Sequence, residues 1–399
     1  MAPSGRPGPS TRCVHAGERP DAASGALNTP IHPSTTYLFP EGAGGEPATH
    51  IYSRYDNPTL QAVEAKLAAL EDADGAYLFA SGMGAIQATC NALLPGPDAG
   101  RRGSIVHLAG IYGGTTALFH EELAPRGVTV AAASPDDEPE IPDGTDIVWI
   151  ESITNPLLRV PDVSDWADAA HDAGARLVVD ATFATPLLQR PLALGADVVV
   201  HSATKYLNGH GDVTAGVVAA DEELLPALWQ RRRNLGATLD PHAAYQVGRG
   251  MKTLDLRLRR QSENALALAQ AMADDPRVMA AHHPGLPDHP DHAIAARVLD
   301  GYGAMLSLDL GSLAAAQAFR RAVQWFAPAA SLGGVESLVS LPLETSHAYA
   351  SPDERRAAGV TDGLVRLSVG IEDLDDLQED LERGLAAAAL AAPSSAEAA

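Results

Sequence analysis

The stretch GADVVVHSATKYLNGHGD, residues 195–212, decides the fold. Its apolar run DVVVHSA (197–203) is typical of a strand in a parallel sheet that helices cover on both faces. Lys205 follows at the carboxyl end of this strand, the edge at which open α/β sheets bind ligands. Burial at that edge disfavours the ammonium form and leaves an amine able to condense with an aldehyde. A loop lysine in solvent is the competing interpretation when this residue is considered alone.

Apolar runs of strand length precede this stretch, and segments with helical spacing of apolar residues separate them. Two such segments are LQAVEAKLAALE (60–71) and VSDWADAAHDAG (163–174), the second ending at a glycine that suits a helix cap. This alternation predicts an α/β fold with a large, doubly wound, mostly parallel sheet. A short strand is predicted at AYLFA (76–80), and buried parallel strands at SIVHL (104–108), VTVAAA (128–133), DIVWIE (146–151) and RLVVD (176–180).

A chain of 399 residues is too long for one compact core and fits two domains with a terminal arm. The predicted units are an N-terminal arm (1–57), a large domain (58–250), a smaller C-terminal α/β domain (251–392) and a flexible tail (393–399). A long helical region (240–275) is expected to lead into the smaller domain. The elements predicted there are strands over 304–311 and 364–370 and a helix over 314–323.

Composition narrows the possible partners. A formal net charge of −23 argues against nucleic acid, whose phosphates would be repelled. No apolar run reaches the roughly 18 residues that a membrane helix needs. The chain has two cysteines, Cys13 and Cys90, and neither lies in a cluster of potential metal ligands in the sequence. Because two cysteines are too few to stabilise a chain of this size by disulfides, they favour a reducing cytoplasm. The histidine-rich segment HHPGLPDHPDH (282–292) has irregular spacing, which favours a solvated loop over a metal site.

Asp180 closes the predicted strand RLVVD, where a carboxylate is costly to bury unless a cation pairs with it. A protonated pyridine nitrogen is such a cation, and keeping it protonated makes the ring an electron sink. The separation of Asp180 and Lys205 leaves room for one crossover between strands of the same sheet. An aspartate that caps the following turn is the alternative.

Two glycine-rich turns follow predicted strands. Ser81-Gly82-Met83-Gly84 opens a helix, so its free N–H groups form a cradle suited to a phosphate. GIYGGT (110–115) carries Tyr112, whose ring could stack on a flat heteroaromatic ring and whose phenol could move protons. Each turn alone is a weak signal, because such turns also occur without any ligand.

Two arginines complete the set of candidates. Arg54, beside Tyr52 in IYSRYDNPT, belongs to the arm, so a phosphate that it reaches could be that of a neighbouring subunit. Arg366, in LVRLSVG, could bind the α-carboxylate of an amino acid from the second domain. Surface ion pairs are the alternative for both.

Taken together, these residues resemble the cysteine/methionine-metabolism family of pyridoxal-phosphate enzymes, which includes cystathionine γ-synthases, cystathionine γ-lyases and methionine γ-lyases. The resemblance runs from about residue 11 to 390 and is most specific in SATKYLNGH (202–210). It implies the fold-type I, aminotransferase-like architecture and a homotetramer built from tight dimers. Further matching stretches are VHAGERPD (14–21), YSRYDNPT (52–59), SGMGAI (81–86), YGGT (112–115), ESITNP (151–156), SLGGVESL (331–338) and DGLVRLSVGIEDLDDL (362–377).

The resemblance also implies roles for single residues. Lys205 would hold pyridoxal 5′-phosphate as a Schiff base and shuttle protons, Asp180 would pair with the pyridinium, and Tyr112 would stack on the ring and assist proton transfer. The phosphate would be held by Gly82, Met83, Ser202 and Thr204, with Tyr52 and Arg54 from the adjacent subunit. The amino-acid end of the substrate would be lined by Asn155, Ser331, Arg366 and Tyr52. No metal ligand is implied.

Departures from the family pattern bear on the substrate. Ala330 stands where a glutamate that can pair with a distal ammonium is common, which argues against cystathionine. Gly114 stands where methionine γ-lyases usually carry a cysteine. Ala181 and Gly211 replace a usual asparagine and a common serine, and Glu344 is an unusual carboxylate in PLETSHA (342–348).

These departures favour an L-amino acid with a small or uncharged γ-substituent as the substrate. No residue marks a site for a second substrate, which favours γ-elimination as the reaction. The alternatives are γ-replacement by a synthase or sulfhydrylase, β-elimination, and, in a different class, aminotransfer. A cofactor-bearing structural or regulatory protein is the non-enzymatic alternative. The leaving group, which could be sulfur, oxygen or halide, and the pathway do not follow from the sequence.

Overall fold

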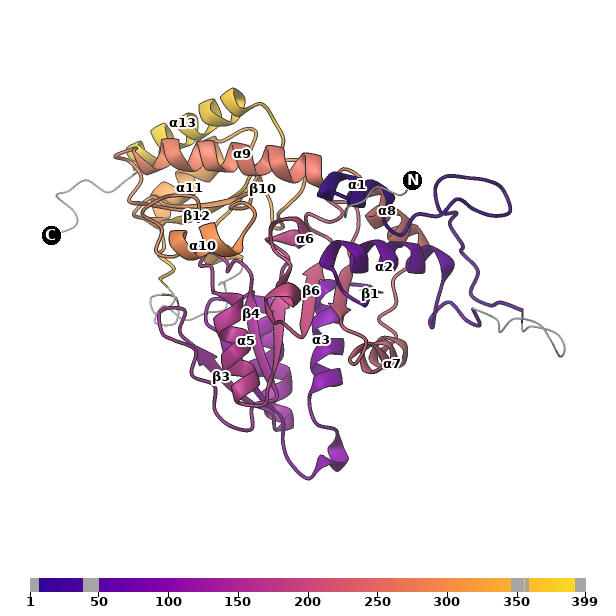
Figure 1. Ribbon diagram of the computed structural model, residues 1–399. Helices are drawn as coiled ribbons and strands as arrows, with labels where there is room; N and C mark the ends of the chain where they lie inside the picture. The colour runs from indigo at the N-terminus through magenta and orange to yellow at the C-terminus, as the bar shows by residue number, and fades with distance from the viewer. Residues whose placement is uncertain (1–6, 39–49, 346–354, 356–358, 392–399) are drawn as a thin grey trace.

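The computed structural model describes residues 7–38, 50–345, 355 and 359–391. The predicted tail at 393–399 lies outside these residues. Within them the strands form two sheets, which we call the large sheet and the small sheet (Figure 1). The arm is not wholly irregular, since the helix α1 (Pro9–His15) packs on α2 (Pro58–Glu71) and α9 (Leu254–Ala273).

The strands of the large sheet are β1 (Gly75–Phe79), β2 (Ser104–Leu108), β3 (Thr129–Ala133), β4 (Ile147–Glu151), β5 (Arg176–Asp180), β6 (Val198–Ser202) and β7 (Gly216–Ala220). Their order is β1-β7-β6-β5-β4-β2-β3, and all pairs are parallel except those of β7 with β1 and β6. Every residue of β4 and β7 is buried, as expected of strands covered on both faces. The doubly wound, mostly parallel sheet is confirmed.

The longer helices around the large sheet are α2 (Pro58–Glu71), α3 (Gly82–Leu93), α5 (Val163–Asp172) and α7 (Leu225–Leu235), and the shorter ones are α4 (Gly113–Ala117) and α6 (Thr185–Leu188). Each of the long helices has a capping residue at one end that its sequence provides. Asn57 caps α2 by accepting from the backbone N–H of Thr59, and Asp162 caps α5 by accepting from that of Ser164. Gly174 has a φ of +75°, which explains why α5 stops there.

The small sheet has the order β10-β11-β12-β9-β8 and is antiparallel except for the β10–β11 pair. Its strands are β8 (Ala280–His282), β9 (Met305–Asp309), β10 (Ala327–Pro328), β11 (Leu338–Ser340) and β12 (Leu364–Ser368). The helices beside it are α10 (His292–Val298), α11 (Leu313–Ala322) and α13 (Leu374–Ala391). In Figure 1 they lie on the opposite side of the molecule from β3 and α5.

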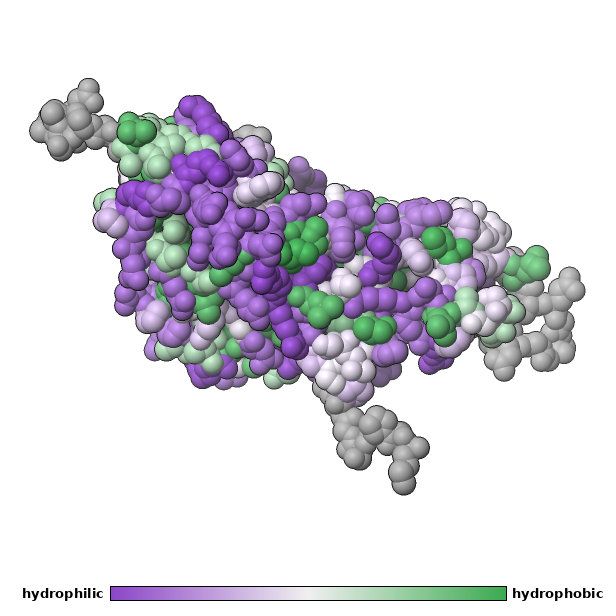
Figure 2. Space-filling view, turned by 90° about the horizontal axis from the view of Figure 1, so that it is seen from above, coloured by the Kyte–Doolittle hydropathy of each residue, from purple (hydrophilic) through white to green (hydrophobic). Residues whose placement is uncertain are grey.

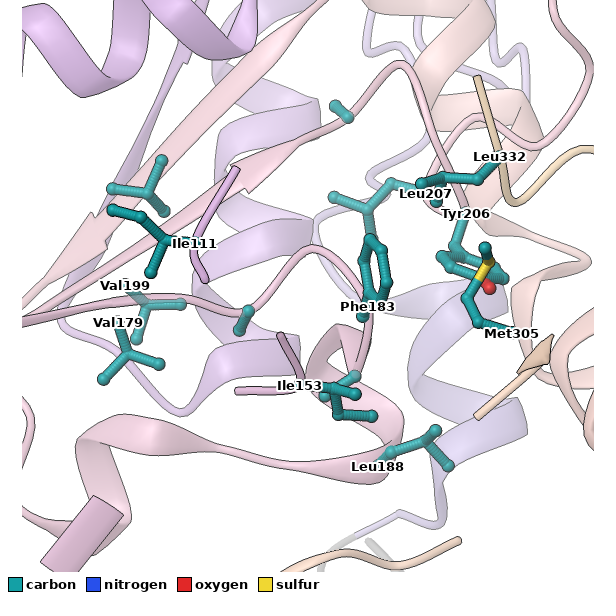
Figure 3. Packing of buried hydrophobic residues seen from close by; sticks show 14 of the residues in the cluster. Ile111, Ile153, Val179, Phe183, Leu188, Val199, Tyr206, Leu207, Met305 and Leu332 are labelled. Atoms are coloured by element: carbon teal, nitrogen blue, oxygen red, sulfur yellow. The ribbon is translucent and has the colours of Figure 1, made fainter. Parts of the chain in front are cut away.

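One hydrophobic core joins the two sheets. Figure 3 shows Phe183, Tyr206 and Leu207, from loops of the large sheet, beside Met305 of β9 and Leu332 of the segment between β10 and β11. A side chain at Gly333 would lie 2.8 Å from the backbone nitrogen of Tyr206, so the two halves meet in close backbone contact. This contact lets residues from both halves share one cavity.

Several elements differ from the sequence predictions. The run 128–133 is a strand but is not buried, because β3 is the edge strand of the large sheet. The helical region 240–275 is two helices, α8 (Pro241–Met251) and α9 (Leu254–Ala273). The apolar run that forms β7 was not predicted as a strand. The domain boundary at residue 250 falls inside α8 and stays a prediction.

The segment 282–292 is not a solvated loop. His283 is fully buried and His289 is 6% exposed, because the segment folds against Tyr302, whose ring stacks on that of His292. In the part of the chain that the structure describes, no group of three or more His, Cys, Asp or Glu side chains is placed to hold a metal ion.

The face shown in Figure 2 is mostly hydrophilic, with apolar side chains scattered over it. None of the described helices is both long enough and apolar enough to cross a membrane.

Candidate active site

A cavity of about 600 Å³ lies at the carboxyl ends of β4, β5 and β6, between the large and small sheets. It brings together most of the residues predicted from sequence: Gly82, Met83, Tyr112, Asn155, Asp180, Ser202, Thr204, Lys205, Ser331 and Arg366. A second cavity of about 210 Å³, with Glu18, Tyr245 and Lys252 in its wall, contains none of them.

Lys205 is held by a residue from the other half of the molecule. Its Nζ donates to Ser331 Oγ at 2.7 Å. Burial, with a smaller contribution from the charge of Arg366, lowers the pKa of Lys205 to about 8. A substantial fraction of this side chain is therefore a neutral amine near pH 8, the form that attacks an aldehyde.

Asp180 is buried at the end of β5 and faces the same cavity. Thr182 donates both its backbone N–H (3.0 Å) and its hydroxyl (2.5 Å) to Oδ1. Burial raises the pKa of Asp180, while the two Thr182 hydrogen bonds oppose that rise. The second oxygen receives neither bond and is available to a donor in the cavity. A cationic N–H at that position would favour the ionised carboxylate.

Glu151 is a cavity residue for which the sequence analysis proposed no role. It ends β4 in direct register with Asp180 on β5, so two buried carboxyl groups lie side by side at the cavity floor. Burial first, and then the charge of Asp180, raises the pKa of Glu151 well above its usual value. Its Oε1 accepts from the backbone N–H of Tyr112 at 2.6 Å. The same sequence signal that pointed to Asp180 could have pointed to Glu151, because both are carboxylates at the end of an apolar strand.

The glycine-rich turn before α3 faces the end of β6. A side chain at Gly82 would lie 3.1 Å from Ser202 Cβ and 3.2 Å from Ser202 Oγ, so any larger residue would crowd Ser202 at this close approach. Ser81 caps the helix by accepting from the N–H of Gly84, which leaves the N–H groups of Gly82 and Met83 at its open end. These groups and the Ser202 hydroxyl form a cradle that suits a phosphate.

Thr204 is less free than the sequence suggested. Its hydroxyl donates to the carbonyl of Ala215 at 3.2 Å and accepts from the N–H of Ala215 at 3.0 Å. Ser202 is thus the better donor to a phosphate. Thr204 instead connects its loop to Ala215, the residue that precedes β7.

Tyr112 lies in the cavity wall and is 46% exposed. A side chain at Gly114 would lie 2.5 Å from Tyr112 Cε1 and 3.1 Å from its hydroxyl oxygen. The tyrosine ring therefore lies over Gly114, and the glycine is required for this ring position.

Arg366 is a buried cation without a carboxylate partner among the described residues. Its Nη1 donates to Asn155 Oδ1 (3.0 Å) and its Nη2 to the carbonyl of Ser331 (3.2 Å), while Nε has no partner. Burial lowers the pKa of Arg366 to about 10. Because an unpaired buried charge is costly, this arrangement fits an anionic ligand such as an α-carboxylate.

Two predicted site residues lie elsewhere. Arg54 donates to the carbonyl of Arg233 and stacks over the rings of Tyr52 and Tyr55, at 5.6 and 5.0 Å from the ring centroids. Neither Tyr52 nor Arg54 lines the cavity of its own chain.

Two of the five positions that depart from the family pattern reach the cavity. Ala330 and Glu344 both line it. Glu344 pairs with Arg320 of α11 and accepts from Gln317 Nε2 at 3.3 Å. The Arg320 guanidinium lowers the pKa of Glu344, so this carboxylate is ionised at neutral pH.

Known proteins resemble the chain over nearly its whole length. L-methionine gamma-lyase of Pseudomonas putida is 42% identical over 397 residues, which cover 96% of this chain and 98% of that protein. Cystathionine gamma-synthase of Mycobacterium bovis is 43% identical over 392 residues, or 95% and 97% of the two chains. The crystal structure of cystathionine gamma synthase from Xanthomonas oryzae pv. oryzae in complex with aminoacrylate and cysteine superposes with a TM-score of 0.90 at 40% identity, covering 97% and 100%.

The sequence pattern of the family described as "Cys/Met metabolism PLP-dependent enzyme" matches residues 10–386. The fold type and the cofactor that the resemblance implied are thereby confirmed. The cavity fits the cofactor, since it combines a buried amine, a buried carboxylate and a glycine cradle that a Cβ would fill. The chain belongs to the Cys/Met metabolism PLP-dependent enzymes and uses pyridoxal 5′-phosphate.

Proposed function

We propose that this enzyme catalyses γ-elimination from an L-amino acid with a small, uncharged γ-substituent. With X as the substituent, X–CH₂CH₂CH(NH₃⁺)COO⁻ and water give HX, 2-oxobutanoate and ammonium. The observation that carries the proposal is that the Lys205 amine shares one cavity with two groups of opposite charge, Asp180 and Arg366.

Arg366 would bind the α-carboxylate of the substrate through the fork that Asn155 and Ser331 hold in place. Lys205, with its lowered pKa, would accept the α-proton and return a proton at a later step. Tyr112 would donate a proton to the leaving group. Asp180 would keep the pyridine nitrogen protonated, and pyridoxal 5′-phosphate supplies the electron sink for the charge that these transfers create.

The uncharged part of the cavity wall supports a small, uncharged γ-substituent. It is largely apolar and includes Met83, Ile86, Phe183, Ala330 and Leu332. Alanine at 330 offers no charge to a second amino acid. The residues named above therefore suffice for elimination with water, which needs no second amino acid.

γ-Replacement is the second candidate, because a mycobacterial relative of 43% identity is named cystathionine gamma-synthase. The deciding measurement is release of 2-oxobutanoate and ammonia from purified holoenzyme, using γ-substituted amino acids with sulfur, oxygen and halide leaving groups. Steady release without a thiol supports elimination. Product that forms only with a thiol co-substrate assigns the enzyme to replacement instead. β-Elimination would yield pyruvate, and aminotransfer would leave the cofactor as pyridoxamine phosphate.

We also infer a homotetramer of tight dimers in which the arm of one copy serves the cavity of the next. Tyr52 and Arg54 would then complete the phosphate and substrate sites of the neighbour, which agrees with their distance from their own cavity. Mixing an Arg54→Ala variant with a Lys205→Ala variant tests this inference. Hybrid dimers regain one complete site if the arm crosses, and none if it does not. Two buried, unpaired cysteines fit a cytoplasmic enzyme.

A further inference from the structure

Glu344 is a charged residue of the described cavity wall that takes no part in the cofactor or amino-acid binding proposed above. The phosphate cradle and Asp180 are assigned to the cofactor, and Arg366 is assigned to the α-carboxylate of the substrate. The remaining described wall includes Ala330, Thr345 and Glu344 beside several apolar residues. We expect a γ-substituent to face this part of the wall.

The backbone places Glu344 close to the carboxylate-binding arginine in the fold. Ser340, the last residue of β11, pairs with Arg366 of β12. The chain then turns through a single 3₁₀ turn (Pro342–Glu344), closed by hydrogen bonds from Glu344 N to the Leu341 carbonyl (2.9 Å) and from Thr345 N to the Pro342 carbonyl (3.2 Å). Glu344 is thus held on the same wall as Arg366 by a short, hydrogen-bonded connection.

The carboxylate of Glu344 is oriented from behind. Arg320 and Gln317, both on α11, donate to it, and neither of them lines the cavity. Glu344 itself is 37% exposed at the side chain, so it presents charge to the cavity while its cationic partner stays outside the wall.

We propose that Glu344 is a specificity-determining residue that selects against γ-substituents ending in an anion, with Arg320 as its positioning residue. The inference rests on the proposed function in one respect, since it takes γ-elimination as the reaction that follows binding. It extends that function by naming the accepted class: a neutral γ-substituent is admitted, whereas one that ends in a carboxylate or phosphate meets a like charge.

The test uses two ligands without a leaving group, so that binding is measured apart from elimination. L-2-Aminoadipate ends in a carboxylate, and L-norleucine has a methyl group at the same place. Titration of each into holoenzyme, followed by the change in cofactor absorbance, gives two dissociation constants. The quantity compared is their ratio in each variant.

In Glu344→Gln the preference for L-norleucine should fall by roughly fivefold, the size of one charge–charge contact near 4 Å in water. In Arg320→Gln the preference should rise, since Glu344 loses its cationic partner. Glu122→Gln, which removes a carboxylate from an exposed Glu122–Arg126 pair of the same kind outside the cavity wall, is the matched control and should leave the ratio unchanged.

An unchanged ratio in Glu344→Gln overturns the inference. A fall in the preference for L-norleucine in Arg320→Gln also overturns it, because removal of the Arg320 charge should strengthen the repulsion between Glu344 and the distal anion. Failure of the proposed function looks different. The binding ratios would then shift as described, while no γ-substituted amino acid releases 2-oxobutanoate.

Discussion

Ser331 Oγ accepts a 2.7 Å hydrogen bond from Lys205 Nζ, and this bond joins the two halves of the molecule at the cavity. Lys205 follows β6 of the large sheet, whereas Ser331 lies between β10 and β11 of the small sheet. The same serine accepts from Arg366 through its carbonyl. One residue thus connects the amine that moves protons with the arginine proposed to bind the substrate.

Ser331 has a φ of +108°, a backbone conformation that non-glycine residues adopt at a cost. Ser331→Gly and Ser331→Ala both remove the hydroxyl, but only glycine relieves the backbone strain. We expect the glycine variant to be more stable than the alanine variant by about 1 kcal/mol. Thermal unfolding of the two holoenzymes measures this difference, and equal midpoints would show that the position is unstrained.

Lys205→Ala should abolish covalent attachment of the cofactor, because Lys205 is the one lysine among the described residues of the cavity wall. The yellow absorbance of the purified enzyme should disappear, and borohydride reduction should add no mass to the chain. Lys252→Ala is the control, since Lys252 lies in the smaller cavity and pairs with Glu18. Retention of reducible cofactor in Lys205→Ala would contradict the assignment.

The lowered pKa of Lys205 predicts how cofactor attachment depends on pH. The folded pKa of about 8 lies below the ordinary 10.5, so the amine loses its proton at lower pH than a free lysine does. The rate at which apoenzyme binds pyridoxal phosphate covalently should therefore rise with pH and level off above about 8. Stopped-flow absorbance gives the profile. A rate that continues to climb to pH 10 would indicate an ordinary lysine.

Glu151 has a raised pKa, so its ionised form is disfavoured by folding. The folded state holds the Glu151 proton more tightly than the unfolded chain, and this contribution to stability is lost as pH rises through the folded pKa. Glu151→Gln keeps an oxygen that accepts from Tyr112 N and removes the ionisable group. We expect its thermal midpoint at pH 8 to exceed that of the wild type by up to a few degrees.

Glu151→Ala should behave in the opposite way. It leaves the partly buried N–H of Tyr112 without its acceptor, at a cost of about 1 kcal/mol. Calorimetry of both variants at pH 6 and pH 8 checks the sign, and a glutamine variant less stable than the wild type at pH 8 would disprove the argument.

Gly114→Ala should displace the ring of Tyr112, because the new methyl carbon would lie 2.5 Å from Tyr112 Cε1. If Tyr112 donates a proton to the leaving group, the loss should appear in kcat more than in KM. Gly96→Ala is the control, since no atom lies within 4 Å of a Cβ there. Unchanged kcat together with an unmoved ring in a crystal structure would refute this role.

Local sequence patterns carried the prediction of the large sheet. Strand-length apolar runs around Asp180 and Lys205 gave the correct elements, because burial on both faces leaves no polar alternation. The same patterns predicted β3 correctly as a strand but wrongly as a buried one, because it lies at the sheet edge and is exposed or half-buried. They were also wrong for the histidine segment, where His283 is buried against Tyr302. Burial at such places depends on which neighbour covers a segment, and a local pattern does not contain that neighbour.

The sequence by itself determined the kind of protein this is: an α/β pyridoxal-phosphate enzyme whose amine is Lys205 and whose buried carboxylate is Asp180. These features are encoded in short stretches, since a strand and the turn after it are local structures. Only the tertiary structure decided that Glu151 lies beside Asp180, that Ser331 links Lys205 to Arg366, and that Glu344 lines the same cavity. Such contacts join residues far apart in the chain, and they exist only because the packed core brings the two sheets together.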